Sequence, residues 1–97
     1  MSREPALLSA SRDDETGEIY IPPRTYAADG SLRRCTETGI PGVGTLVGWT
    51  VSDGEQYGLV VLDAGPRLQV LLSDEAHAYG ERYVGVEADE EVRFFRA

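Results

Sequence analysis

A series of short apolar segments, each ended by a turn, fills the chain from Gly42 to the C-terminus and constrains the fold more than any other feature. The segments are rich in β-branched and aromatic residues, and clusters of glycine, proline, serine or aspartate separate them, which is typical of short strands. In one of them Leu68, Val70 and Leu72 alternate with polar residues, as in a half-buried strand. The sequence predicts strands over residues 44–51, 57–62, 67–72, 83–86 and 91–96.

The segment between the third and fourth predicted strands has a different pattern. Ser73 is a suitable N-cap, Asp74 and Glu75 suit the first turn of a helix, and Gly80 suits a helix C-terminus. We therefore expect one short helix over residues 73–80.

Short strands with a helix in this place match the plan of an OB-fold, a five-stranded and partly open Greek-key barrel. Glycines inside predicted strands agree with this plan, because a small barrel needs points where its strands bend: Gly44, Gly48 and Gly58. We predict a mainly β fold with an OB-fold over residues 42–97, and a meandering open sheet is the alternative.

The first 41 residues divide into two segments. Residues 1–15 are expected to form an N-terminal arm, in which Pro5 to Ala10 suits one or two helical turns and Leu7 and Leu8 are the side chains able to pack. A disordered N-terminus is the favoured form of this arm, and docking on another surface is the alternative. Residues 16–41 are rich in turn formers, and we expect a small hairpin that pairs Ile19–Ile21 with Ser31–Cys35 around the Asp29-Gly30 dipeptide.

Composition limits the classes of partner. At 97 residues the chain is large enough for one modest core, and 41% hydrophobic and 27% charged residues indicate a globular protein. A net charge of -8, with arginine as its only basic residue besides one histidine, disfavours nucleic acid. The chain has a single cysteine, no signal-like N-terminus and no apolar run of the roughly 20 residues that span a bilayer, so we expect a cytoplasmic protein that does not enter membranes.

Three motifs together resemble the family catalogued as domain of unknown function thirty-five, in which a rubredoxin-like zinc ribbon precedes an acyl-CoA-associated OB-fold. The resemblance covers roughly residues 16–97, and the motifs are Pro22-Pro23-Arg24, Gly42-x-Gly44-Thr45-Leu46-x-x-Trp49-Thr50-Val51 and Leu59-Val60-x-Leu62-Asp63-x-Gly65-Pro66-Arg67-Leu68. It implies a small non-catalytic subunit that pairs with a thiolase-superfamily acyltransferase or aldolase.

The chain departs from that family at the zinc ribbon. With Gly17 and the Pro-Pro-Arg element aligned, the expected cysteine positions hold Asp13, Thr16, Ala27 and Gly30. These residues do not supply the four thiolate or imidazole ligands of a structural zinc site. The sequence therefore predicts a degenerate ribbon without zinc.

No catalytic group stands out in the sequence. His77, Asp74 and a serine supply the residue types of a Ser-His-Asp triad, but we do not expect a triad, because a lone histidine in a short surface helix is most often solvated. Cys35 follows Arg33 and Arg34, whose charges favour a thiolate, but no base or oxyanion hole accompanies it. We expect a protein that is not an enzyme and that binds no cofactor tightly.

Two groups of residues are candidates for contacts. Guanidinium groups bind phosphates well, so four arginines are candidates for contacting a partner: Arg24, Arg33, Arg34 and Arg67. They would contact the phosphates of the partner's coenzyme A or acidic residues of the partner. The alternative is that they form surface ion pairs within this chain. The candidate partner interface is a rigid apolar ridge formed by Tyr20, Ile21, Pro22 and Pro23. The alternative is that Tyr20 and Ile21 simply cover the barrel.

The sequence thus favours an accessory subunit that forms a hetero-oligomer with a thiolase-superfamily enzyme, stabilises it and helps shape its substrate channel. A free-standing OB-fold that binds nucleic acid or oligosaccharide is the alternative, disfavoured by net charge and by a face that reads Leu59, Val60, Val61, Leu68 and Val70 with little aromatic surface. A catalytic role for Cys35 is the third hypothesis.

Overall fold

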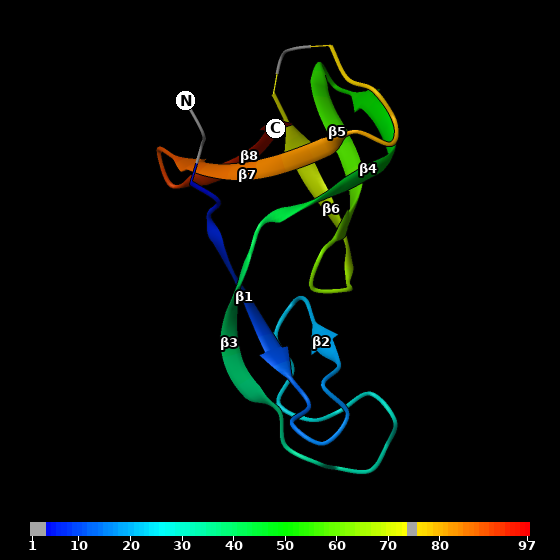
Figure 1. The fold of residues 1–97 in the computed structure, drawn as a ribbon, viewed down its shortest axis with the longest axis vertical. Coiled ribbons are helices and arrows are strands. Elements are labelled where there is room, and N and C mark those ends of the chain that lie inside the picture. The colour runs from blue at the N-terminus through cyan, green and yellow to red at the C-terminus, as the bar shows by residue number, and fades with distance from the viewer. Residues whose placement is uncertain (1–3, 74–75) are drawn as a thin grey trace.

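The computed structural model describes residues 4–73 and 76–97, and these residues form two β bodies (Figure 1). The first is a three-stranded sheet with the order β2-β1-β3, and the second is a closed barrel with the order β4-β5-β6-β8-β7. The strands are β1 Leu7–Arg12, β2 Ile19–Tyr20, β3 Thr36–Pro41, β4 Val43–Ser52, β5 Glu55–Leu62, β6 Arg67–Leu72, β7 Arg82–Ala88 and β8 Glu91–Arg96. The predicted mainly β fold with a five-stranded barrel is therefore confirmed. The alternative prediction, a meandering open sheet, is wrong because the barrel is closed.

The barrel closes because β4 pairs with two neighbours and β6 pairs with β8. The first part of β4 lies between β5 and β7, and the Leu71↔Arg93 and Leu72↔Phe94 pairs of β6 and β8 are parallel, while the other pairs of the barrel are antiparallel. Antiparallel hairpins that enclose one parallel pair give the Greek-key arrangement expected from the sequence. Asp53 and Gly54, with φ of 49° and 79°, form the two-residue turn between β4 and β5.

The glycines predicted to lie at bends in the strands have two different uses. Gly48 lies at a bulge in β4, where the register with β5 shifts after Leu46. Gly58 instead faces the barrel interior, where a Cβ atom would lie 2.8 Å from Leu46 Cδ1 and 2.9 Å from Leu72 Cδ2. Close packing of the core, not bending alone, therefore requires glycine at position 58.

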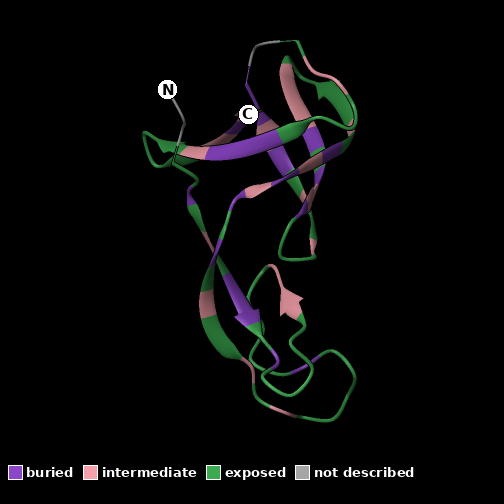
Figure 2. Ribbon diagram, in the orientation of Figure 1, coloured by how far each residue is buried: buried purple, intermediate pink, exposed green. Residues whose placement is uncertain are grey.

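The core fills the barrel and continues into the first sheet. Figure 2 shows buried residues along the barrel strands and on β1, while the loops of the first sheet are mostly exposed, with Asp13 and Ala27 as buried exceptions. The side chains of Ala10 and Ile40 belong to the same cluster as the barrel residues Leu46, Val60, Leu62, Val70, Leu72, Tyr83 and Phe94. Backbone bonds join the two bodies as well, since the Ala6 amide donates to the Gly85 carbonyl and the Gly85 amide donates to the Gly42 carbonyl.

The helix predicted over residues 73–80 is wrong in the part that the structure describes. Residues 76–80 contain no helix, and Asp74 and Glu75 lie outside the described residues. Ser73 does not cap a helix there; its amide donates to the Phe94 carbonyl at the end of β6. The connection between β6 and β7 therefore covers an end of the barrel without helical structure in its described part.

Two predictions for the first 41 residues are also wrong. The Leu7–Arg12 segment is a strand and not a helical turn, because pairing with β3 supplies the hydrogen-bond partners that a short isolated helix lacks. Ile19–Ile21 does not pair with Ser31–Cys35: Ile19 and Tyr20 pair with β1, and Tyr26 forms the bridge to Arg34. Ile19 and Tyr20 thus pair with the strand before them and not with the segment after them.

Candidate functional site

The two turns that would carry zinc ligands in the ribbon family are joined here by one arginine. The Arg33 guanidinium donates to Asp13 Oδ2 and to Asp29 Oδ2, both at 2.7 Å, and its Nε lies 2.9 Å from Glu15 Oε2. Asp13 belongs to the first turn, which the Gly17 amide closes by donating to the Asp13 carbonyl, and Asp29 belongs to the second. A cation held by side chains from both turns thus links them, as a metal would.

Electrostatics favour the charged state of this cluster. The hydrogen bond from Arg33 lowers the pKa of Asp13, whose side chain is only 2% exposed. Bonds from the Ser31 hydroxyl and amide and from Arg33 lower the pKa of Asp29 to about 2. The same carboxylates raise the pKa of Arg33. The ion pairs are therefore complete throughout the neutral pH range.

These residues do not fit a zinc ion. Asp13 is the one potential ligand among the four positions, and its carboxylate is already bound to Arg33. Thr16, Ala27 and Gly30 provide no thiolate, imidazole or carboxylate. No group of three or more metal-ligating side chains occurs in the described parts of the chain.

The four arginines predicted to make contacts separate into two kinds. Arg33 is held in the ion pairs of the cluster, whereas no carboxylate of the described residues lies within ion-pair distance of Arg24, Arg34 or Arg67. Arg67 begins β6 and lies opposite Val61 on the barrel. Given seventeen acidic residues in the chain, the lack of ion pairs at Arg24, Arg34 and Arg67 leaves their charges available to an external anion.

Arg24 and Arg34 are brought together by the fold. They line one hollow of about 250 Å³ with Pro23, Thr25, Cys35 and Glu37. Arg24 lies 5.5 Å from the centre of the Tyr20 ring and donates to the Tyr26 carbonyl, and Arg34 lies 5.9 Å from the centre of the Tyr26 ring. Stacking on tyrosines restricts both guanidinium groups before any ligand arrives.

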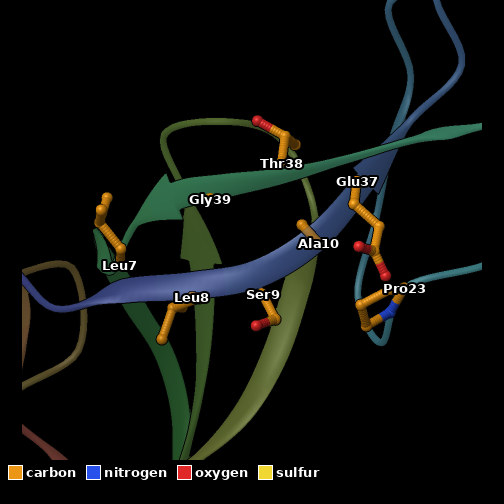
Figure 3. Close-up of a pocket in the computed structure, with 8 residues that line it drawn as sticks. All are labelled: Leu7, Leu8, Ser9, Ala10, Pro23, Glu37, Thr38 and Gly39. Carbon is orange, nitrogen blue, oxygen red and sulfur yellow. The ribbon is translucent and has the colours of Figure 1, made fainter.

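A second and larger hollow adjoins the first. It has a volume of about 400 Å³, runs along β1 and β3, and shares Pro23 and Glu37 with the arginine hollow. Figure 3 shows Leu7 at one end of it and Glu37 with Pro23 at the other. The two hollows therefore form one continuous concave surface that turns around Pro23.

The residues of the predicted apolar ridge do not share one environment. Ile21 is half-buried and packs against the core, which agrees with its alternative reading as a cover of the barrel. The half-buried Tyr20 donates its hydroxyl to Glu18 and accepts from the Ala28 amide. Pro22 and Pro23 are exposed, so they are the part of the ridge left for a partner.

The residues considered for catalysis form no catalytic arrangement within the described residues. His77 is not a solvated helix residue, which corrects the prediction: its Nε2 donates to the Ser73 carbonyl at 2.9 Å and its Nδ1 accepts from the Tyr83 hydroxyl at 2.8 Å. Its ring packs edge-on against Trp49. Cys35 is half-buried beside the two arginines, with no histidine lining its hollow. His77 thus ties the connection between β6 and β7 to the barrel, and both of its ring nitrogens are hydrogen-bonded, so neither is free to act as a base.

Sequence reasoning missed an apolar hollow on the barrel. The sequence predicts Val60 and Val70 on the ligand-binding face of β5 and β6, but both point into the core. The outer face of these strands therefore consists of other residues. That face contributes to a hollow of about 340 Å³ lined by Gly48, Trp49, Thr50, Tyr57, Gly58, Leu59 and Gln69. Alternation within β5 and β6 already directs Leu59 and Gln69 outward. Trp49 and Thr50 are placed only when the bulge at Gly48 is known, because the bulge changes the face on which the following residues of β4 lie.

Comparison with known proteins agrees with the fold. No family model matches the chain, and no curated protein matches it. Four chains of solved structures match, among them a chain of a structure titled "Ltp2-ChsH2(DUF35) aldolase", with a TM-score of 0.70 and 20% identity over 91% of this chain and 83% of that one. Residues 4–73 and 76–97 contain no helix long and apolar enough to cross a membrane. The chain thus has the fold of a chain in that aldolase structure, which confirms at the level of the fold the resemblance inferred from its sequence.

Proposed function

We propose that the protein is a non-catalytic accessory subunit that binds a thiolase-superfamily acyltransferase or aldolase, stabilises it and helps shape the channel of its acyl-CoA or acyl-carrier substrate. The observation that carries the proposal is the likeness, over 91% of the chain, to a chain of a structure whose title names an aldolase with two components. Fold alone does not determine function, so the proposal also needs support from the surface of this chain.

Arg24, Arg34 and Arg67 supply that support. Their guanidinium groups lack carboxylate partners among the described residues, although the chain carries a net charge of -8. Such groups suit acidic residues of an enzyme, or the pyrophosphate and ribose phosphate of the coenzyme A that the enzyme binds. Arg33 has a different role, since it holds the two ribbon turns together. The protein itself then needs neither zinc nor a tightly bound cofactor.

The absence of a nucleophile with its base in the described residues favours a partner over an enzyme. A single cysteine is compatible with the reducing cytoplasm, where we expect the complex to form.

The test is association with a condensing enzyme. The tagged chain is purified from its native lysate, proteins that co-elute are identified, and the mass of the complex is measured by size exclusion with light scattering. We expect a stoichiometric complex with a thiolase-superfamily enzyme whose activity or stability falls when the chain is removed. A monomer that changes neither property of any such enzyme would refute the proposal.

The hollow at Trp49 and Tyr57 supports the second candidate, a free-standing OB-fold that binds single-stranded nucleic acid or oligosaccharide, because aromatic side chains stack on bases and sugars. Trp49 is the single tryptophan, so its fluorescence reports directly on this hollow. Quenching by oligothymidylate that weakens with salt would favour this candidate. Unchanged fluorescence up to millimolar ligand would exclude it.

A further inference from the structure

The first sheet leaves part of one strand edge without a partner. β1 pairs with β3 along all six of its residues, but on its other edge it pairs with β2 through Ser11 and Arg12 alone. β2 ends there because Pro22 and Pro23 follow Ile21, and proline has no backbone N–H to continue a ladder. No described strand therefore covers the edge of β1 over residues 7–10, which lines the larger hollow.

Two observations indicate which backbone groups point out of this edge. Pro41 lies opposite Leu7 and has no N–H, so this pair cannot exchange the two bonds of a hydrogen-bonded pair. At the preceding position the Gly42 amide donates to the Ala6 carbonyl at 2.8 Å. Alternation along the ladder then directs the amides of Leu8 and Ala10 towards β3, and those of Leu7 and Ser9 outward. An outward N–H and C=O from every second residue is what an additional strand binds.

The surface beside this edge is apolar at one end and basic at the other. The Leu7 side chain is 72% exposed at one end of the hollow. Around Pro23, at the other end, lie the two tyrosine-backed guanidinium groups of Arg24 and Arg34. Glu37 lines both hollows and is the one acidic residue there, so the cations outnumber the anion. The chain as a whole carries a charge of -8, so a surface on which cations outnumber the anion is opposite in sign to the net charge and suits an acidic segment.

We propose that an extended, acidic segment of the partner enzyme adds as a strand to the edge of β1 over residues 7–10 and places a carboxylate between Arg24 and Arg34. The inference rests on the proposed function, since it specifies how the same partner is bound. Backbone bonds to Leu7 and Ser9 give the segment its extended form, and the two guanidinium groups select its charge.

Hydrogen–deuterium exchange of the full chain, alone and in complex with the condensing enzyme, tests this inference. We expect the amides of Leu7 and Ser9 to exchange at least about tenfold more slowly in the complex, because they gain acceptors on the added strand. Exchange that stays at the free rate within a stable complex would overturn the inference and leave the proposed function standing. Absence of any complex would overturn both. Equal protection in the free chain, together with self-association, would assign the edge to a second copy and also overturn it.

Matched variants distinguish loss of strand addition at the edge of β1 from damage to the fold. Ser9→Pro removes an outward N–H and is expected to keep the melting temperature while weakening enzyme binding at least about tenfold. Leu8→Pro removes an N–H that faces β3 and is expected to lower the melting temperature instead. Arg24→Glu or Arg34→Glu should weaken binding at least about tenfold, whereas Arg82→Glu, which changes an exposed ion pair with Asp63 on the barrel, should leave it within about threefold. Enzyme binding by Ser9→Pro at the affinity of the unmodified chain would contradict an added strand.

Discussion

The close contact of Gly58 with Leu46 predicts a specific energetic coupling across the barrel. The Leu46 side chain is fully buried, so Leu46→Ala is expected to destabilise the chain by about 3–4 kcal/mol through lost burial and a residual cavity. Gly58→Ala places a Cβ atom 2.8 Å from Leu46 Cδ1 and 2.9 Å from Leu72 Cδ2. Since both neighbours are packed in the core, overpacking is expected to destabilise the chain by about 1–3 kcal/mol.

The double variant should be more stable than the two single effects imply. Removing the Leu46 δ-methyl groups leaves space that the new Cβ at position 58 fills in part, and only the contact with Leu72 then remains tight. We expect a favourable coupling of about 1–2 kcal/mol. In a domain of this size that corresponds to a melting temperature roughly 4–16 °C higher than additive effects would give.

Denaturation followed by circular dichroism and by Trp49 fluorescence measures this coupling through a double-mutant cycle. Gly48→Ala is the matched control, because a Cβ there meets nothing closer than Leu59 Cβ at 3.9 Å. Its effect should add to that of Leu46→Ala. Additivity within about 0.5 kcal/mol for the Gly58 pair would refute the packing described for the barrel interior.

Three further predictions concern the arginine cluster of the ribbon. Arg33→Met should speed amide exchange over residues 13–33 much more than in the barrel strands, because Asp13 is left buried without its cation; uniform exchange throughout would contradict this. The pKa values of Asp13 and Asp29 are lowered on folding, so their contribution to stability is full above their ordinary value of 3.8 and is lost as the pH falls below it, for Asp29 through its folded value of about 2; an NMR titration in which raising the pH loosens the ribbon would contradict this sign. Zinc and then a chelator should both leave the melting curve unchanged, and a zinc-dependent rise would show that metal displaces Arg33.

The candidate site could be predicted from the sequence only as a set of residues. The Pro-Pro-Arg element and the arginines at positions 33, 34 and 67 were recognisable as candidates for binding anions. Arg33 holds the ribbon, whereas Arg24, Arg34 and Arg67 have no carboxylate partner among the described residues. This division depends on which carboxylates lie within reach. Asp13 is twenty positions from Arg33, and no local pattern indicates that contact.

The sequence by itself determined the β class, the barrel strands and the loss of zinc ligands, because turn residues, strand alternation and ligand identity are local properties. Only the tertiary structure decided that Leu7–Arg12 is a strand, that residues 76–80 are not a helix, and that His77 is hydrogen-bonded to Ser73 and Tyr83. The first two depend on hydrogen-bond partners far along the chain, β3 for the N-terminal strand and Phe94 for Ser73. The third depends on Tyr83, which is six positions from His77 but belongs to the barrel strand β7. The physical reason is that such partners satisfy backbone and side-chain groups better than a short local helix does, and only the folded chain brings them together.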